Sequence, residues 1–189
     1  MPKVLEPTAE LLQKCKDGNR AAFREIFDMY RSYAYNLIYK IAGPHGDHED
    51  LIQEVFFQIY LSMKSFKGES TFKTWFHRVV IHVCTRQWRY QNTGKRISPK
   101  DTVSYDLVEH GVAHNGMNHA KHYELKSLVE KALEAIDTKL RVPLVLHIYS
   151  ELDLSEISTI IGIPEGTVKS RLFTARKKLR EYLDSLESG

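Results

Sequence analysis

Apolar residues recur at spacings of three and four along almost the whole 189-residue chain, and this helical period restricts the fold more than any other feature. One apolar stripe runs over residues 22–41 and stops at Gly43-Pro44, a pair that ends helices. Two more helices are expected over residues 47–66 and 71–90. Because strand patterns are scarce, the sequence predicts an all-α fold.

The period disappears near residue 92 and resumes at Tyr123. The intervening segment is rich in Gly, Asn, Ser and His and has no sustained pattern, as is typical of a linker. We therefore expect two small helical domains, over residues 5–92 and 123–187, joined by a flexible linker over residues 93–122.

Composition is compatible with two packed domains in the cytoplasm. The chain is 42% hydrophobic and 11% aromatic, which is enough to build cores. Its two cysteines, Cys15 and Cys84, are far apart and fit a reducing compartment better than a disulfide framework. No apolar run is long enough for a signal peptide or a membrane span, so we expect a cytoplasmic protein without membrane insertion.

The charge is unevenly distributed, although the net charge is only +3. Residues 64–100 contain nine bases and one acid, and residues 169–180 contain six bases and no acid. An acidic stretch separates these two basic blocks. Two such blocks suggest two contacts with a polyanion such as nucleic acid, although composition alone favours a solvated basic surface equally.

The helix expected after residue 47 has two different faces. One is an apolar stripe that should be buried: Ile52, Val55, Phe56, Ile59 and Met63. The opposite face mixes carboxylates with large apolar groups: Asp50, Gln53, Glu54, Phe57 and Leu61. Such a mixture suits a reversible protein interface, in which apolar groups supply burial and charges supply steering, better than a purely solvated surface.

The C-terminal segment "LDLSEISTIIGIPEGTVKSRLFTARKKLREYL", residues 152–183, predicts a helix-turn-helix. Asp153 and Glu156 have the spacing of a capping box, and Gly162-Ile163-Pro164 is a short turn before a second helix that Glu165 opens. That second helix has small and basic residues on one face, which suits a major groove. An ordinary helical hairpin with a solvated basic face is the alternative.

The segment "GIPEGTVKSRL…A…LR" resembles the fourth conserved region of the extracytoplasmic-function bacterial sigma factors. Upstream, "DHEDLIQEVFFQIY…F…STFKTWFHRV" is similar to the second conserved region of that family, and the spacing matches its minimal two-domain group. The resemblance implies a protein that binds RNA polymerase core, reads the minus-35 promoter element with its second domain and melts the minus-10 element with its first.

The resemblance also implies partners and site residues. The mixed face at 50–61 would dock on the clamp helices of the polymerase largest subunit, and the second domain would contact the flap. The minus-10 element would meet a specificity loop and the helix after it: Lys67, Glu69, Ser70, Thr71, Thr74, Arg78, Thr85, Arg86 and Arg89. The helical period places one row of that helix outward, opposite the aromatic core stripe: Thr74, Arg78, Ile81, Thr85 and Arg89. The minus-35 element would meet the second helix of the helix-turn-helix: Thr167, Lys169, Ser170, Arg171, Thr174, Arg176 and Lys177.

Four positions depart from the family pattern or are ambiguous. His82 and Arg86 stand where the family usually has Asn and Asp, so the minus-10 sequence does not transfer. Pro143 is atypical and lies either in the first turn of a helix that starts near Leu140 or within a longer helix that it kinks. Trp75 falls on the core side of its helix.

Other classes of function fit less well. The sequence has no P-loop, HExxH, paired CxxC or nucleophile elbow, so we expect neither an enzyme nor a cofactor. A stand-alone helix-turn-helix regulator would explain the second domain but not the mixed face of the first. The linker histidines lack nearby cysteines and are expected to be exposed rather than zinc ligands: His110, His114, His119 and His122. Family membership further implies an anti-sigma factor.

Overall fold

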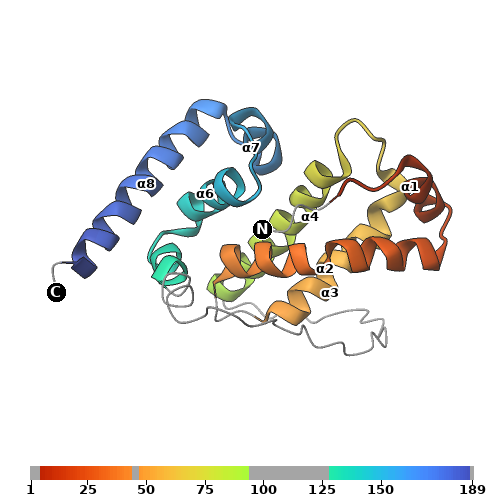
Figure 1. Cartoon of the computed structure of the whole chain (residues 1–189), viewed down its shortest axis with the longest axis horizontal. Coiled ribbons are helices and arrows are strands. Elements are labelled where there is room, and N and C mark those ends of the chain that lie inside the picture. Colours follow the sequence, from red (N-terminus) through yellow and green to blue (C-terminus); the bar gives the residue numbers. More distant parts are fainter. Residues whose placement is uncertain (1–4, 44–46, 94–127, 188–189) are drawn as a thin grey trace.

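The computed structural model describes residues 5–43, 47–93 and 128–187, and every regular element within these ranges is helical (Figure 1). This confirms the all-α fold class. Residues 128–134 are also helical. The principal helices are α1 (Ala9–Lys16), α2 (Arg20–Ala42), α3 (His48–Ser62), the 3-10 turn η1 (Met63–Ser65), α4 (Phe72–Thr93), α6 (Thr138–Tyr149), α7 (Leu154–Ile161) and α8 (Glu165–Glu187).

Side-chain caps fix where the first helices begin. The Thr8 hydroxyl accepts from the amide of Leu11 at 3.2 Å, and the Asn19 side chain accepts from the amide of Ala22 at 3.1 Å. Each satisfies one of the amides that lack a partner in a first helical turn. At the other end of α2, Gly43 has a φ of 83°, a backbone conformation that residues with a side chain rarely adopt. The predicted break after α2 is therefore confirmed.

Helices α2, α3 and α4 form the core of the first half. All five residues of the predicted α3 stripe are buried. Aromatic side chains fill the centre, where the Tyr30 ring lies 5.1 Å from Phe72 and 4.8 Å from Phe76, measured between centroids. Trp75 packs on Phe66 at 5.0 Å and is only partly buried, which agrees with a mainly structural role.

The segment before α1 crosses the start of α4. Glu6 accepts hydrogen bonds from the backbone amides of Phe72 and Lys73. The backbone carbonyl of Leu5 accepts from the Tyr30 hydroxyl at 3.3 Å. A residue 66 positions away therefore caps the helix that follows the predicted specificity loop.

Helices α6, α7 and α8 form the second half, and α7–α8 is the predicted helix-turn-helix. The capping box of Asp153 and Glu156 is present, and Gly162 ends α7 in the left-handed conformation with a φ of 72°. Helix α6 begins at Thr138, so Pro143 lies in its second turn. The helix starts two residues before Leu140, because Asp137 caps it by accepting from the Lys139 amide, so the expected first-turn position of Pro143 is wrong.

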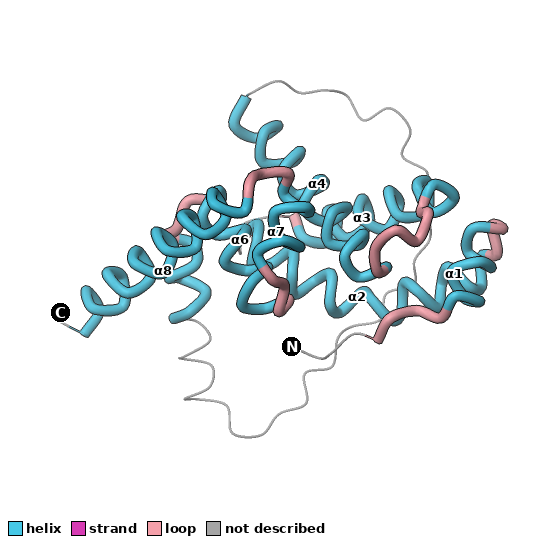
Figure 2. Tube along the Cα trace, turned by 90° about the horizontal axis from the view of Figure 1, so that it is seen from above, coloured by secondary structure: helices cyan, strands magenta, loops and turns pink. Residues whose placement is uncertain are grey.

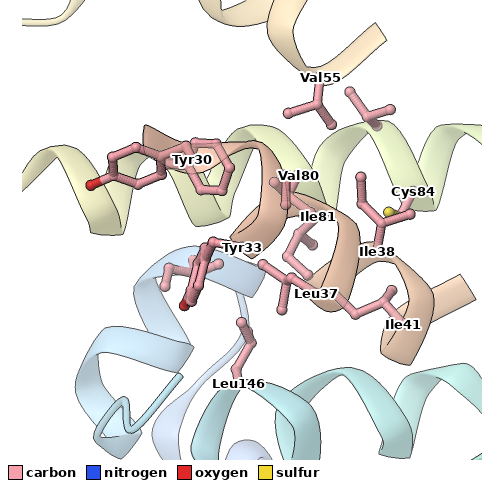
Figure 3. Close-up of a cluster of buried hydrophobic side chains, with 14 of the residues drawn as sticks. Tyr30, Tyr33, Leu37, Ile38, Ile41, Val55, Val80, Ile81, Cys84 and Leu146 are labelled. Carbon is pink, nitrogen blue, oxygen red and sulfur yellow. The ribbon is translucent and has the colours of Figure 1, made fainter. Parts of the chain in front are cut away.

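The two halves pack against each other. Helix α2 contacts α6, and α4 contacts α7. Figure 2 shows α6 and α7 between α8 on one side and α2–α4 on the other. Leu146 of α6 points toward Leu37 and Tyr33 of α2 (Figure 3). The buried apolar residues of both halves form one continuous cluster, whereas the sequence pattern predicted two domains joined only by a linker.

Candidate nucleic-acid and protein interfaces

The mixed face of α3 lies on the surface. Asp50 and Gln53 are exposed, and Glu54 and Phe57 are half-buried. Leu61 is 57% exposed. Helix α3 packs mainly on α2, α4 and η1, and Asp50, Gln53 and Leu61 stay exposed among the described residues. A surface with carboxylates beside exposed apolar side chains is therefore available to a partner.

Two features of this region were not expected from the sequence. Tyr60 lies next to Leu61 and is 38% exposed, so it extends the apolar part of the face. Glu54 forms an ion pair with Arg86 of α4 and accepts a hydrogen bond from Nε2 of the Gln58 side chain at 3.0 Å. The structure thus joins a residue predicted to bind a protein to one predicted to bind DNA.

The predicted specificity loop lies between η1 and α4. Lys67, Glu69 and Thr71 are exposed, and Ser70 is half-buried. The Thr71 hydroxyl accepts from the backbone amide of Thr74 at 3.1 Å, so it helps to cap α4. Together with the Glu6 carboxylate described above, this bond fixes the loop relative to the helix.

The outer face of α4 is less accessible than expected. Thr74 and Ile81 were predicted to point outward, but they are only 8% and 6% exposed. Arg78 and Thr85 are half-buried. The prediction of an outward position is therefore wrong for Thr74 and Ile81.

Other basic groups on α4 differ in exposure. Arg86 and His82 are exposed, and the side chain of Arg89 lies outside the described residues. The Nε atom of Arg78 is buried and has no hydrogen-bond partner within the described part of the chain. A buried guanidinium N–H without an acceptor carries a cost in free energy.

A buried polar triangle links α2, α4 and the residue after α6. The Tyr33 hydroxyl lies 2.8 Å from Nε2 of His77 and donates to Oγ of Ser150 at 3.1 Å. The third side, between Nε2 of His77 and Oγ of Ser150, measures 3.0 Å. Burial, reinforced by the charge of Lys73, lowers the pKa of His77 to about 4. The ring is therefore neutral at neutral pH and can accept a hydrogen bond at Nε2.

One side of α8 presents the predicted minus-35 residues to solvent. Thr167 and Arg171 are half-buried, whereas the remaining five are exposed: Lys169, Ser170, Thr174, Arg176 and Lys177. The opposite side packs on α6 and α7 through Val168, Leu172 and Ala175, which are buried. This division of one helix into a packed side and a basic side is the arrangement that helix-turn-helix proteins use in a major groove.

Phe173 is the main residue of α8 that the sequence reading missed. It is 72% exposed and lies one helical turn from Lys169, Arg176 and Lys177, on the basic side. The sequence contains a signal for this residue, because Phe173 falls outside the apolar period of α8 and therefore on its polar face. An apolar ring in a major groove can contact thymine methyl groups.

Neither a metal centre nor a membrane-spanning helix emerges from the described residues. No group of three or more His, Cys, Asp or Glu side chains within them could hold a metal ion. The four linker histidines lie outside these residues. None of the described helices is both long and apolar enough to cross a membrane.

Two family models match the chain. The model for sigma-70 region 2 matches residues 26–93, and the model for sigma-70 region 4 matches residues 126–179. Among curated proteins, the ECF RNA polymerase sigma factor SigW of Bacillus subtilis is 29% identical over 181 residues, covering 93% of this chain and 96% of that protein. The ECF RNA polymerase sigma-E factor of Escherichia coli K12 is 28% identical over 180 residues, covering 93% and 94%.

Solved structures with the same fold include CnrH in complex with the cytosolic domain of CnrY. That structure has a TM-score of 0.66 and 20% identity, covering 93% of this chain and 96% of the other. The sigma factor RpoE in complex with the anti-sigma factor NepR, from Bartonella quintana, has a TM-score of 0.63 and 21% identity, covering 86% and 96%. These similarities agree with the helical architecture described above.

Proposed function

The chain belongs to the extracytoplasmic-function sigma factors of the sigma-70 family, and we propose that three of its surfaces divide the work of promoter recognition. It is a transcription initiation factor with sigma-70 regions 2 and 4 in that order. The proposed domains follow the expected boundaries: region 2 over residues 5–92, a linker over 93–122 and region 4 over 123–187. The stand-alone helix-turn-helix regulator is not favoured, because it leaves region 2 without a role.

The mixed face of α3 is the proposed docking surface for the clamp helices of RNA polymerase core. The observation that carries this proposal is the accessibility of Asp50, Gln53 and Leu61 on a helix whose other side is buried in the core. Phe57, Leu61 and Tyr60 would supply apolar burial, and the carboxylates would orient the complex through basic groups of the partner. Region 4 is proposed to contact the flap.

Helix α8 is the proposed reader of the minus-35 element. Ser170 and Arg171 lie in its first two turns, where a recognition helix reaches base edges. The Ser170 and Thr174 hydroxyls donate to backbone carbonyls of their own helix at 3.0 Å, which leaves their oxygen lone pairs for base amino groups. Lys169, Arg176 and Lys177 would meet phosphates, and Phe173 is added here as a contact to the thymine methyl groups.

The specificity loop and α4 are proposed to bind the melted minus-10 strand. Lys67, Glu69, Ser70 and Thr71 would surround a base that has left the stack, at a cost of a few kcal/mol that a shaped pocket can offset. Arg78 is half-buried and would meet the phosphate backbone through the accessible part of its guanidinium group. The remaining residues proposed for this surface are Thr74, Thr85, Arg86 and Arg89.

An anti-sigma factor is the proposed regulatory partner, and the cytoplasm is the proposed location. One solved relative is described as a sigma factor in complex with an anti-sigma factor. Polymerase and promoters are cytoplasmic in bacteria, so a factor that joins them has to act there. Catalysis is not part of the proposal, since every role assigned to this chain is a binding role.

Reconstituted transcription tests the proposed function. RNA polymerase core and this protein are incubated with fragmented genomic DNA, and the transcripts are sequenced. We expect transcripts that start downstream of one shared pair of promoter elements and that are absent when either component is omitted. A chain that binds duplex DNA but adds no transcripts to core polymerase would contradict the assignment and favour a stand-alone regulator.

A further inference from the structure

Two of the proposed binding surfaces meet at one carboxylate. Glu54 lies on the mixed face of α3, which is proposed to dock on polymerase, and Arg86 lies on α4, among the residues proposed for the minus-10 element. Nη2 of Arg86 pairs with Oε1 of Glu54. Arg86 is therefore in direct contact with the docking face, although the sequence predicted it only for DNA.

The contacts of the Glu54 carboxylate are divided unevenly between its two oxygens. Oε1 accepts from Nη2 of Arg86 and from Nε2 of Gln58, the latter at 3.0 Å. None of the described residues donates a hydrogen bond to Oε2. Since an ionised carboxylate can accept at both of its oxygens, two donors of the same chain hold the group through one oxygen and leave the other for a donor of a partner.

Docking would change the surroundings of this ion pair. The side chain of Glu54 is 32% exposed and that of Arg86 is 56% exposed, so in the free protein water screens the pair and it adds little to folding stability. A partner on the α3 face would displace that water. A carboxylate that loses its water needs donors, because a buried charge without partners is costly. Arg86 and Gln58 already provide the donors for Oε1.

We propose that Arg86 is a positioning residue of the polymerase docking face: together with Gln58 it holds the Glu54 carboxylate so that Oε2 accepts from a basic group of RNA polymerase core. This inference rests on the proposed role of the α3 face. The role is additional to any contact of Arg86 with DNA. A side chain that is already held has less conformational freedom to lose on binding, so the pair favours docking.

The test is the dissociation constant of each full-length variant for immobilised core polymerase. Arg86→Ala leaves Oε1 with Gln58 alone and should weaken binding about tenfold, which is less than the loss for a fully buried charge pair. Adding Arg86→Ala to Glu54→Gln should weaken binding no further, because the arginine acts through that carboxylate. Lys64→Ala is the matched control, since this exposed cation directly follows α3 and forms no ion pair with any other described residue.

Exchange of the two charges separates positioning from a purely structural role. Glu54→Arg with Arg86→Glu keeps an ion pair between α3 and α4 but places the cation on the docking face. We expect this protein to unfold in urea as wild type does and to bind core polymerase at least tenfold more weakly, because like charges then meet at the interface. Arg86→Lys, which keeps one cationic donor, should bind better than Arg86→Ala.

Three results would overturn the positioning role. Wild-type affinity of the charge-exchanged protein would show that the pair only joins α3 to α4. A further loss when Arg86→Ala is added to Glu54→Gln would show that the arginine does not act through Glu54. Wild-type affinity of Arg86→Ala, with a defect in minus-10 melting that persists when all core polymerase is occupied, would assign the arginine to DNA alone.

The docking face itself is tested separately by Asp50→Arg with Gln53→Arg, which leaves the ion pair intact. If that variant binds core polymerase as wild type does, the proposed role of the α3 face is wrong. Loss of binding by that variant, together with wild-type affinity of Arg86→Ala, would contradict the positioning role and leave the docking face in place.

Discussion

The hydroxyl of Tyr33 donates a 3.1 Å hydrogen bond to Oγ of Ser150, which lies 117 residues further along the chain. Both atoms also contact Nε2 of His77 within 3.0 Å. The donor and acceptor roles of Nε2 in these contacts depend on the tautomer of the ring. The contact between the two halves therefore includes a buried titratable side chain.

Stability should accordingly depend on pH through His77. Burial lowers its pKa from 6.5 to about 4 in the folded protein. Above pH 6.5 the ring is neutral in both states, so its contribution is constant. As the pH falls from 6.5 toward 4, the unfolded ring binds a proton that the folded ring does not, and the free energy of unfolding should fall by roughly 3 kcal/mol.

The measurement is urea unfolding of wild type and His77→Gln between pH 7.5 and about 4.5. Other carboxylates and histidines titrate in both proteins, so the difference between their slopes isolates His77. We expect the wild-type curve to fall more steeply below pH 6.5. Parallel curves would show that His77 gains its proton equally easily in the folded state.

Glu6 should affect promoter melting although it precedes the first helix of the chain. Its carboxylate caps the first amides of α4, next to the proposed specificity loop. Glu6→Ala should destabilise the protein by about 1 kcal/mol, as the loss of a helix cap usually does, and should reduce melting of the minus-10 element. Glu6→Gln should melt the element better than Glu6→Ala, because the oxygen of the glutamine side-chain amide can still accept a hydrogen bond from the backbone.

Permanganate reactivity of promoter thymines measures melting by the reconstituted holoenzyme, and Glu25→Ala on the exposed side of α2 is the control. Equal melting by wild type and Glu6→Ala, at a temperature where both are folded, would show that the cap does not position the loop.

Ser170 and Arg171 should determine the choice of the minus-35 sequence. The double variant Ser170→Ala with Arg171→Ala is expected to lose about 1–3 kcal/mol of discrimination per base contact. Since Ser170 is exposed and Arg171 half-buried, the domain should remain folded. Competition between wild-type and substituted minus-35 duplexes measures the effect. A variant that still ranks the duplexes as wild type does would place recognition elsewhere on α8.

Periodicity predicted the helices because each one buries a continuous stripe. The five residues of the predicted apolar stripe, Ile52, Val55, Phe56, Ile59 and Met63, are all buried. The caps at Gly43 and Asp153 end and begin helices where the turn chemistry indicated. These features depend on neighbours within four residues in the chain, which a sequence displays directly.

The contact between the halves could not be predicted in the same way. A helical period shows which residues of α4 lie opposite its apolar stripe, but not which distant element packs against them. Thr74 and Ile81 were therefore predicted to lie on an outward face, and no role was predicted for His77. Only the fold brings Ser150 to that ring, since their separation of 73 residues includes the linker.

The central claim is that the open face of α3 docks on RNA polymerase core, and co-elution with core polymerase tests it most directly. Glu54 is paired with Arg86, so the cleanest variant leaves it intact and changes two exposed residues, Asp50→Arg with Gln53→Arg. The matched control, Ala21→Arg with Glu25→Arg, makes the same change in net charge at exposed positions of α2.

Like charges at a protein interface cost several kcal/mol, whereas exposed substitutions change folding stability by only about 0.5 kcal/mol. We therefore expect the α3 variant to be folded by circular dichroism and to elute separately from core polymerase, while the control co-elutes as wild type does. A folded α3 variant that co-elutes with wild-type affinity would contradict the assignment of this face.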